Sequence, residues 1–576
     1  MRRLLSTYRY RLTDNRSLLA YSLLGIVGGL ASGLAVLAFE LAIESLGGAF
    51  GVGDGGEGFE SLAPWMHFAL PAGGALLLGC AYAFLAPQDR ETGIVHVISR
   101  MHSHYSVLPL RNALVQFVGG AFALASGQSG GREGPGVHLG GAANSLLGQW
   151  LQLPNNSLRV LVACGTAGGI AAAFHTPLAG VIFAMEVIMV EYTVVGFMPV
   201  ILSAVSASAV SRWLHADSVL FSLPPLQMQS LLELPWIVLL GFCCGLAVSG
   251  FIRLSTLTAR FANWHVTLRF TLAGLLTGAL ALLTPEILGI GYDTLDLTLR
   301  GEMALGALLL IALCKLLATA VSCGAGMPIG LIGPNLLIGA CLGGVLGAIG
   351  GLLQPDLASD PTLYIVIGMG AAMAAVLNAP LAAILAVVEL TQTISISMAA
   401  MLAIVTATLT TSGVFRQRSA HQSVLHQLKR QVPDDPVSQL LHRSNVQSSM
   451  DTRVVRVPAI LDRDGRLPLL ETPPAWCLVQ REGEDLYLVD GPELLAWLDG
   501  RPAEEPAADL TTADIRRWTI AAVPMQATLR QATDAMREAT AEAVIVYEHS
   551  PSTGNRLLHG VLTRESIERF FLAGLQ

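Results

Sequence analysis

The chain has 576 residues, of which 53 % are hydrophobic and 13 % are Asp, Glu, Lys or Arg, and its mean hydropathy is +0.58. Soluble domains carry about 25 % charged residues, so this composition excludes a single soluble domain, a disordered chain and a nucleic-acid-binding protein. The net charge of −8 lies in one part of the chain, because residues 431–576 hold 14 Lys+Arg and 22 Asp+Glu while residues 1–430 hold 20 of each. A membrane domain over 1–430 and a soluble domain over 431–576 are therefore predicted.

The N-terminal segment predicts which way the chain faces. Its first apolar run, about 18–46, is too long for a cleaved signal peptide and ends without a cleavage-like site. Five arginines precede it: Arg2, Arg3, Arg9, Arg11 and Arg16. Positive flanking charge predicts a cytoplasmic N-terminus, and the charged tail is expected on the same side, which requires an even number of crossings. We expect a multi-pass protein of the plasma (inner) membrane.

Many apolar segments of the first 430 residues are shorter than the roughly 20 residues that a membrane crossing needs. The segments are 18–46, 67–86, 109–127, 135–151, 158–174, 177–190, 194–213, 233–257, 268–284, 303–322, 334–353, 363–377, 380–391 and 395–413. Several are interrupted by Gly or Pro. Interrupted helices are tolerated in lipid only where they are buried in protein or line a cavity, so the pattern indicates a transport site.

Two stretches of the membrane domain match each other. Gly165–Glu186 and Gly368–Glu389 share seven of 22 positions at an offset of 203, including the Pro-Leu-Ala triplet and the final Glu. Upstream of each, GPGVHLGG (134–141) resembles GPNLLIGA (333–340) at an offset of 199. Shared Ala/Gly composition alone would not keep Pro and Glu in register. The match predicts duplicated halves over about 18–215 and 233–430, with a central binding site where interrupted segments correspond.

The stretch Gly127–Pro135 combines glycines, one Arg and one Glu with a proline that suits a first helical turn. A helix N-terminus presents free N–H groups and a partial positive charge, so it can bind an anion. Gly330–Pro334 opens the corresponding helix of the second half. Two such ends facing each other would hold a small monovalent anion weakly enough to release it. Arg132 is a further candidate anion-binding residue here, and the alternative is that it anchors this loop or raises the local potential without contacting the ion.

Glu133 is the unusual residue of this stretch. An ionised carboxylate at a helix N-terminus is stabilised by the same amides as an anion, so it could occupy the anion's place and swing away when protonated. Ionisable groups within a membrane are functional candidates. A simple first-turn Glu without a gating role is the alternative.

The intact GREGP motif at Gly131–Pro135, the AAAFHTPLAGVIFAMEV stretch at 171–187 and the G-x-x-x-P motif at Gly330–Pro334 resemble the chloride channel and chloride/proton exchanger (CLC) family over nearly all of 18–430. The resemblance implies an all-α polytopic membrane domain with two inverted-topology repeats, embedded in the lipid bilayer as a homodimer with one anion pathway per subunit. It further implies a gate at Glu133 and anion contacts from Gly134, Leu331 and Ile332.

Two departures from the family pattern concern the anion site. Glu91-Thr92-Gly93-Ile94-Val95 stands where the family usually has Gly-Ser-Gly-Ile-Pro. Thr92, Gly93 and Ile94 are still expected to bind the anion, and Glu91 adds a carboxylate near the pathway. His421 aligns loosely with the family's anion-coordinating tyrosine. It is either a donor to chloride or an interfacial histidine.

Family exchangers often carry a proton-delivering glutamate directly after the position aligned with Glu186, where this chain has Val187. The substitution favours a passive, voltage- or pH-gated chloride channel. The alternative is a chloride/proton antiporter with a different proton path, through Glu186, Glu191 or Glu91. Glu186 could equally have a structural role at a helix end. No catalytic arrangement is recognised, so an enzyme is not expected.

Residues 431–576 alternate short strands and amphipathic helices, and the later unit reads strand, helix, strand, strand, helix. This resembles a cytoplasmic α/β pair of cystathionine-β-synthase-type (CBS) domains, with Gly560–Glu565 as the closing motif. An adenine nucleotide is the open candidate ligand there, and chloride is otherwise expected as substrate without a cofactor. The eight cysteines include no C-x-x-C pair, so neither a metal site nor a disulfide framework is expected.

Overall fold

The computed structural model of the chain describes residues 18–53, 57–191, 194–214, 226–355, 358–428, 441, 444–462, 466, 469, 472–481, 484–500, 507–549 and 556–574. The five N-terminal arginines, the Pro224-Pro225 segment and the predicted boundary at 430/431 lie outside the described residues. The chain divides into a helical unit, Leu18–Leu151 with Leu158–Val432, and a second unit formed mainly by Pro433–Gln576.

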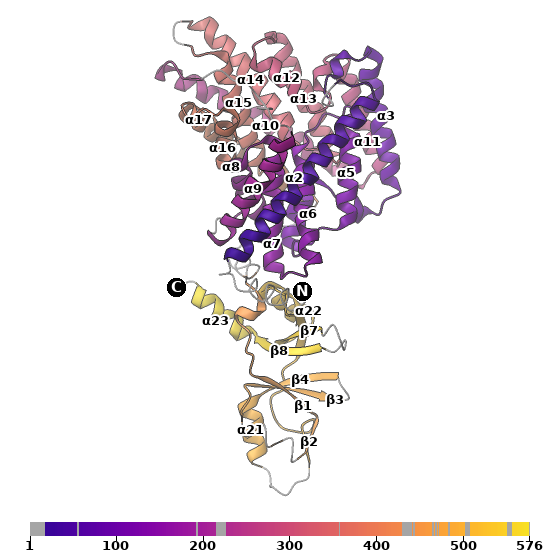
Figure 1. Cartoon of the computed structure of the whole chain (residues 1–576), viewed down its shortest axis with the longest axis vertical. Helices are drawn as coiled ribbons and strands as arrows, with labels where there is room; N and C mark the ends of the chain where they lie inside the picture. Colours follow the sequence, from indigo (N-terminus) through magenta and orange to yellow (C-terminus); the bar gives the residue numbers. More distant parts are fainter. Residues whose placement is uncertain are drawn as a thin grey trace. The chain divides into compact units, whose positions relative to one another are not determined.

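The helical unit, coloured indigo to orange in Figure 1, contains the two sequence halves. The helices of the first half are α2 (Leu18–Ala49), α3 (Pro64–Ala83), α4 (Gly93–Ser103), α5 (Leu110–Ala125), α6 (Glu133–Trp150), α7 (Asn155–Phe174), α8 (Pro177–Phe183), the π-helical turn η4 (Ala184–Met189) and α9 (Val194–Leu214). Those of the second half are α10 (Leu234–Ala259), α11 (Val266–Ala281), α12 (Tyr292–Leu299), α13 (Leu305–Gly324), α14 (Ile332–Leu353), α15 (Pro361–Leu377), α16 (Pro380–Thr391), α17 (Ser397–Leu409), η8 (Thr410–Val414) and α18 (Ala420–Gln427).

Among the described residues, seven helices are long and apolar enough to cross a membrane, namely those built on α2, α3, α7, α10, α13, α14 and α17. Five further apolar helices have only 10–17 residues, among them α5, α15 and α16. The short helices correspond to the interrupted segments expected from the sequence. The chain is an integral multi-pass membrane protein, as predicted.

Close helix packing occurs at equivalent places in the two halves. A Cβ on Gly140 of α6 would lie 2.3 Å from the carbonyl oxygen of Gly165 on α7. A Cβ on Gly339 of α14 would lie 2.2 Å from the carbonyl oxygen of Gly368 on α15. Only glycine lets these backbones approach so closely, as is common between membrane helices. Each half therefore builds the same helix pair on the same glycine contact.

Two glutamates join the halves reciprocally. The carboxylate of Glu389 on α16 accepts hydrogen bonds from the N–H groups of Leu178 and Ala179 at the start of α8, at 3.0 and 2.8 Å. The carboxylate of Glu186 accepts from Leu381 and Ala382 at the start of α16, at 3.3 and 2.8 Å. Each half thus caps a helix of the other. Such an exchange is what two repeats related by a pseudo-two-fold axis produce.

The described residues of the second unit contain the antiparallel strand pair β2-β5 and two three-stranded sheets of one topology. Its elements are β1 (Val454–Pro458), β2 (Ile460–Asp462), β3 (Trp476–Arg481), β4 (Glu484–Asp490), α21 (Gly491–Asp499), β5 (Ala507–Asp509), β6 (Ile520–Pro524), α22 (Leu529–Glu538), β7 (Ala543–His549), β8 (Arg556–Thr563) and α23 (Arg564–Gly574). In both sheets the middle strand pairs parallel with the first strand and antiparallel with the third, in the orders β1-β3-β4 and β6-β7-β8. The predicted α/β class is confirmed, and the later unit has the expected strand-helix-strand-strand-helix order.

Candidate functional site

The two motif loops meet in the interior of the helical unit. Gly131 and Gly330 form an antiparallel bridge, in which each N–H donates to the other's carbonyl, at 2.8 and 2.7 Å. Helix α6 begins two residues after Gly131, and α14 begins two residues after Gly330. The bridge therefore holds the starts of both helices at one place, as the anion-site hypothesis requires.

The carboxylate of Glu133 lies between these helix starts. Glu133 is the first residue of α6 and is completely buried. Its Oε2 accepts a hydrogen bond of 3.2 Å from the N–H of Gly333, in the first turn of α14. The hydroxyl of Tyr292, at the start of α12, donates to Oε1. An acidic group from one half thus occupies the amide end of the corresponding helix in the other half, where an anion would bind.

Glycine makes room for this side chain on both sides. A Cβ on Gly131 would lie 2.1 Å from Oε2 of Glu133, and a Cβ on Gly333 would lie 3.1 Å from Oε1. A Cβ on Gly134 would lie 2.8 Å from the Cα of Gly330. The glycines of the two motifs are therefore required by the close approach of two loops and one carboxylate.

Arg132 supports the loop from outside this contact. Its Nη1 lies 3.3 Å from Oε1 of Glu40 on α2, and its Nη2 donates to the carbonyl oxygen of Ala173 at 3.4 Å. Its guanidinium also lies over the ring of Tyr292, 5.3 Å from the centroid. These contacts favour the anchoring role considered for Arg132.

Most of the predicted anion-binding residues line one cavity of about 330 Å³. These residues are Thr92, Gly93, Ile94, Gly134, Leu331 and His421, and Glu91 lines the cavity with them. The Thr92 hydroxyl makes no capping hydrogen bond to α4. His421, on α18, is buried, and its Nδ1 has no hydrogen-bond partner among the described residues. The Thr92 hydroxyl is thus not used as a helix cap, and the His421 imidazole keeps a buried nitrogen without a hydrogen-bond partner among the described residues. Ile332, the first residue of α14, is fully buried and is not among the residues that line the cavity.

The loop before α4 is held by two amide side chains. The Gly93 N–H, at a φ of +73°, donates to Oε1 of Gln116 at 2.7 Å. The Nδ2 of Asn112 donates to the carbonyl oxygen of Glu91 at 3.0 Å. The Gly93 amide is thus engaged by protein, so Gly93 shapes the cavity wall without offering its N–H to an ion. The Glu91 side chain is 29 % exposed, and its backbone is held in place.

The remaining acidic candidates have other partners. Glu186 caps α16, as described above, which favours its structural role. Glu191 is buried in an ion pair with Arg159, with Oε1 2.5 Å from Nη2. Val187 is 8 % exposed within the turn η4. Neither Glu186 nor Glu191 lines the anion cavity.

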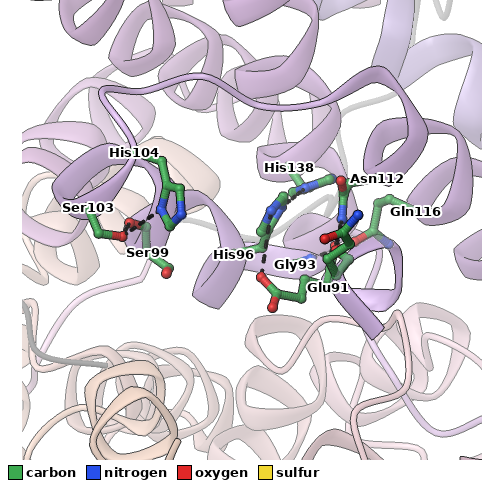
Figure 2. Close-up of polar contacts among 10 residues, drawn as sticks. Glu91, Gly93, His96, Ser99, Ser103, His104, Asn112, Gln116 and His138 are labelled. Carbon is green, nitrogen blue, oxygen red and sulfur yellow. Dashed lines mark hydrogen bonds and ion pairs between the residues drawn. The ribbon is translucent and has the colours of Figure 1, made fainter. Parts of the chain in front are cut away.

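Besides Glu40, Gln116 and Asn112, three polar residues at this site were not predicted from the sequence. Tyr292 contacts Glu133 from a position 159 residues away. His96 and His138 form a buried hydrogen-bonded pair, and Figure 2 shows His96 linked by dashed lines to Glu91 on one side and to His138 on the other. His138 stands within the GPGVHLGG block, but nothing in a single sequence connects it to His96, 42 residues earlier.

Similarity to known families and proteins covers more than half of the chain. A family model described as voltage gated chloride channel matches residues 74–412. A ClcB-like chloride channel protein of Ralstonia nicotianae is 32 % identical over 399 residues, covering 67 % of this chain and 93 % of its own. An H(+)/Cl(-) exchange transporter ClcA of Vibrio cholerae is 34 % identical over 316 residues, covering 53 % of this chain and 68 % of its own.

Two solved structures have the same fold. A slow cyanobacterial Cl-/H+ antiporter superposes with a TM-score of 0.63 at 23 % identity, over 71 % of this chain and 97 % of its own. A eukaryotic CLC transporter superposes with a TM-score of 0.58 at 20 % identity, over 98 % of both chains. The second likeness extends through the C-terminal unit.

Proposed function

Because the chain belongs to the voltage gated chloride channel (CLC) family, we propose that it carries chloride across the membrane in exchange for protons. In this proposal Glu133 alternates between an ionised state that occupies the anion site and a protonated state that leaves it. The exchanger was the alternative in the sequence analysis, and it now replaces the passive channel as the preferred function.

The proposal rests on the hydrogen bond that the Glu133 carboxylate accepts from the N–H of Gly333. The helix-end amides attract an anionic group, whether it is a carboxylate or a halide. A chloride entering from the Thr92 side competes with Glu133 for this position. Protonation removes the charge that holds the side chain there, so chloride binding and proton binding become linked through one site.

The names of the relatives support the same function. The Vibrio cholerae relative is named an H(+)/Cl(-) exchange transporter, and a structural neighbour is a Cl-/H+ antiporter. Val187 remains the observation that favours a passive channel, because a buried apolar residue cannot carry a proton. A channel is therefore kept as the second candidate.

Reversal potentials in a bilayer with both chloride and proton gradients separate the two candidates. For an exchanger we expect the reversal potential to move when the proton gradient alone is changed. A reversal potential that stays at the chloride equilibrium value under every proton gradient would leave only the channel. Parallel recordings from bilayers that contain no protein measure the leak of protons through the lipid.

The assembly and location are proposed on the resemblance and the flanking charges. We infer a homodimer with one pathway per subunit in the plasma (inner) membrane, with both termini cytoplasmic. Chemical cross-linking of the protein in membranes tests the dimer. An adenine nucleotide in the C-terminal unit is also proposed, and calorimetric titration of the full chain with ATP tests it.

A further inference from the structure

The hydroxyl of Tyr292 meets the Glu133 carboxylate directly. It donates a hydrogen bond to Oε1, while the N–H of Gly333 donates to Oε2 at 3.2 Å. Tyr292 and Glu133 are both buried. An ionised carboxylate has only acceptor oxygens, so the hydroxyl must be the donor in this pair. The carboxylate therefore receives one donor from a side chain at the start of α12 and one from the backbone at the start of α14.

The hydrogen bond from Tyr292 is stronger when Glu133 is ionised. Hydrogen bonds with one charged partner are roughly twice as strong as those between neutral groups. A donor aimed at a carboxylate therefore favours its charged form, which is costly to bury without such donors. The hydroxyl thus stabilises the state in which Glu133 occupies the proposed anion position, relative to the protonated state that leaves it.

The segment that precedes α12 is attached to the motif loop beside Glu133. The N–H of Gly130 donates to the carbonyl oxygen of Gly289 at 3.2 Å. Lys315, a fully buried residue of α13, donates from Nζ to the carbonyl oxygens of Ile287 and Gly289, at 2.9 and 3.1 Å. The approach to α12 is therefore fixed both to the loop that carries the carboxylate and to a neighbouring helix.

The start of α12 is also joined to the loop between α2 and α3. Oε2 of Glu57 accepts a hydrogen bond of 2.8 Å from the N–H of Asp293, and Oδ2 of Asp293 accepts one of 3.1 Å from the N–H of Gly58. Gly291, directly before Tyr292, has a φ of +84°, in the left-handed region that favours glycine. The backbone of Tyr292 is thus held from both sides, so the place of its hydroxyl is set by contacts that do not involve Glu133.

Several charged groups surround this pair. The guanidinium of Arg132 lies 5.3 Å from the centre of the Tyr292 ring, and its Nη1 lies 3.3 Å from Oε1 of Glu40. The first turn of α14, which begins IGPN, brings no titratable side chain. Burial and the charge of Asp293 raise the pKa of Glu57 to about 7. The groups that interact electrostatically with Arg132 or Lys315 further include Glu60 and Cys341. Glu57 therefore titrates near neutral pH, and a test of the Tyr292–Glu133 pair must separate its contribution.

We propose that Tyr292 is a positioning residue for the gate, whose hydroxyl holds the ionised carboxylate of Glu133 in the proposed anion position. This rests on the proposed gating role of Glu133. When Glu133 takes up a proton, its hydrogen bond to Tyr292 weakens and the side chain leaves, while Tyr292 stays on the anchored start of α12. Tyr292 thereby sets the pH at which the carboxylate gives up its place.

The test removes the hydroxyl and keeps the ring. In Tyr292→Phe the ionised carboxylate loses one donor, so Glu133 takes up its proton at a higher pH. We expect the pH of half-maximal chloride transport to rise by about one unit, a tenfold change in proton concentration, as loss of a hydrogen bond to a charged group predicts. Chloride flux from proteoliposomes, measured at a series of pH values with equal pH on both sides, gives this profile.

Tyr364→Phe is the matched control. Tyr364 is also buried and donates to the carboxylate of a glutamate, Glu233, whose contacts lie outside the Glu133 site. This variant loses the same kind of hydrogen bond and should keep the wild-type pH profile. A merely structural role for Tyr292 would lower stability without moving the profile, so an unmoved profile in Tyr292→Phe would overturn the proposal.

A double variant separates Glu133 from other titrating groups. The hydroxyl acts through the carboxylate, so Tyr292→Phe should add no further shift in a Glu133→Gln background, where the two effects are not additive. A shift that persists in this background would show that Tyr292 acts on another group, such as Glu57, and would overturn the proposal.

Two further outcomes keep the proposal and the gate distinguishable. If Glu133→Gln loses its pH dependence while Tyr292→Phe keeps the wild-type profile, the gate stands and the role of Tyr292 fails. If Glu133→Gln keeps its pH dependence, both fail together.

A second variant covers the case in which Tyr292→Phe does not fold. Replacement of Tyr292 by 3-fluorotyrosine keeps the hydroxyl and makes it a more acidic, stronger donor. The ionised carboxylate is then held more firmly, so the profile should move in the opposite direction, to lower pH. A profile unchanged by the fluorine would overturn the proposal.

Discussion

The two halves of the membrane unit share a scaffold and differ in chemistry. At the offset of 203, Glu186 corresponds to Glu389, and each caps a helix of the other half. At the offset of 199, Glu133 corresponds to Ile332, and His138 corresponds to Leu337. The comparison indicates that matched acidic residues join the repeats, whereas Glu133 and His138 have no counterpart in the second half.

The physical reason lies in the pseudo-symmetry. A contact away from the symmetry axis is generated twice, so the cap needs a glutamate in each half. The proposed anion site lies where Gly131 and Gly330 meet, and one position there can take only one carboxylate. A second acidic group at Ile332 would repel the first, because two carboxylates sharing a site cannot both ionise readily. One half therefore supplies the carboxylate and the other supplies the amide that receives it.

The largest effect is expected from removing the unmatched carboxylate. Glu133→Gln cannot ionise, so we expect proton flux and the pH dependence of transport to fall by at least about tenfold, with chloride flux retained. Coupled flux measurements over pH 5–8 check this. Glu389→Gln is the matched control and should keep coupling. If transport by Glu133→Gln keeps the pH dependence of the wild-type protein, Glu133 is not the gate.

The shared scaffold should respond equally in both halves when its glycine contacts are crowded. Gly140→Ala and Gly339→Ala would each force a methyl group against a backbone carbonyl, and overpacking of this kind costs about 1–3 kcal/mol. Thermal unfolding in detergent checks both variants. Gly351→Ala, also on α14 but with open space around a Cβ, is the control and should be neutral or slightly stabilising. Strongly unequal losses would contradict the equivalence of the two helix pairs.

A smaller effect is expected from the reciprocal caps. Glu186→Ala and Glu389→Ala should each lower the free energy of unfolding by about 0.5–2 kcal/mol, as loss of a helix cap does, with transport coupling kept. The exposed Glu302→Ala serves as control. Loss of proton flux in Glu186→Ala but not in Glu389→Ala would contradict the equivalence of the two caps. Glu186 would then act in transport and not only as a cap.

Several features of this protein follow from its sequence alone. The composition and charge distribution predict a membrane unit followed by an α/β unit, and both are present. The repeats at Gly165–Glu186 and Gly368–Glu389, with the glycine and proline motifs, predict two helix starts near Glu133. These predictions succeed because hydrophobic length, helix-start residues and duplication are local or self-repeating properties of a chain.

Only the tertiary structure decided which side chains meet. Tyr292 reaches Glu133 across 159 residues, His96 reaches His138 across 42, and Glu186 reaches Ala382 across 196. Each contact depends on how helices pack against one another, and a polar residue inside an apolar segment looks the same in sequence whether its partner is an ion, an acid or a helix end. The sequence determined that a buried carboxylate would stand at a helix start, and packing decided that its receiving amide comes from the other repeat.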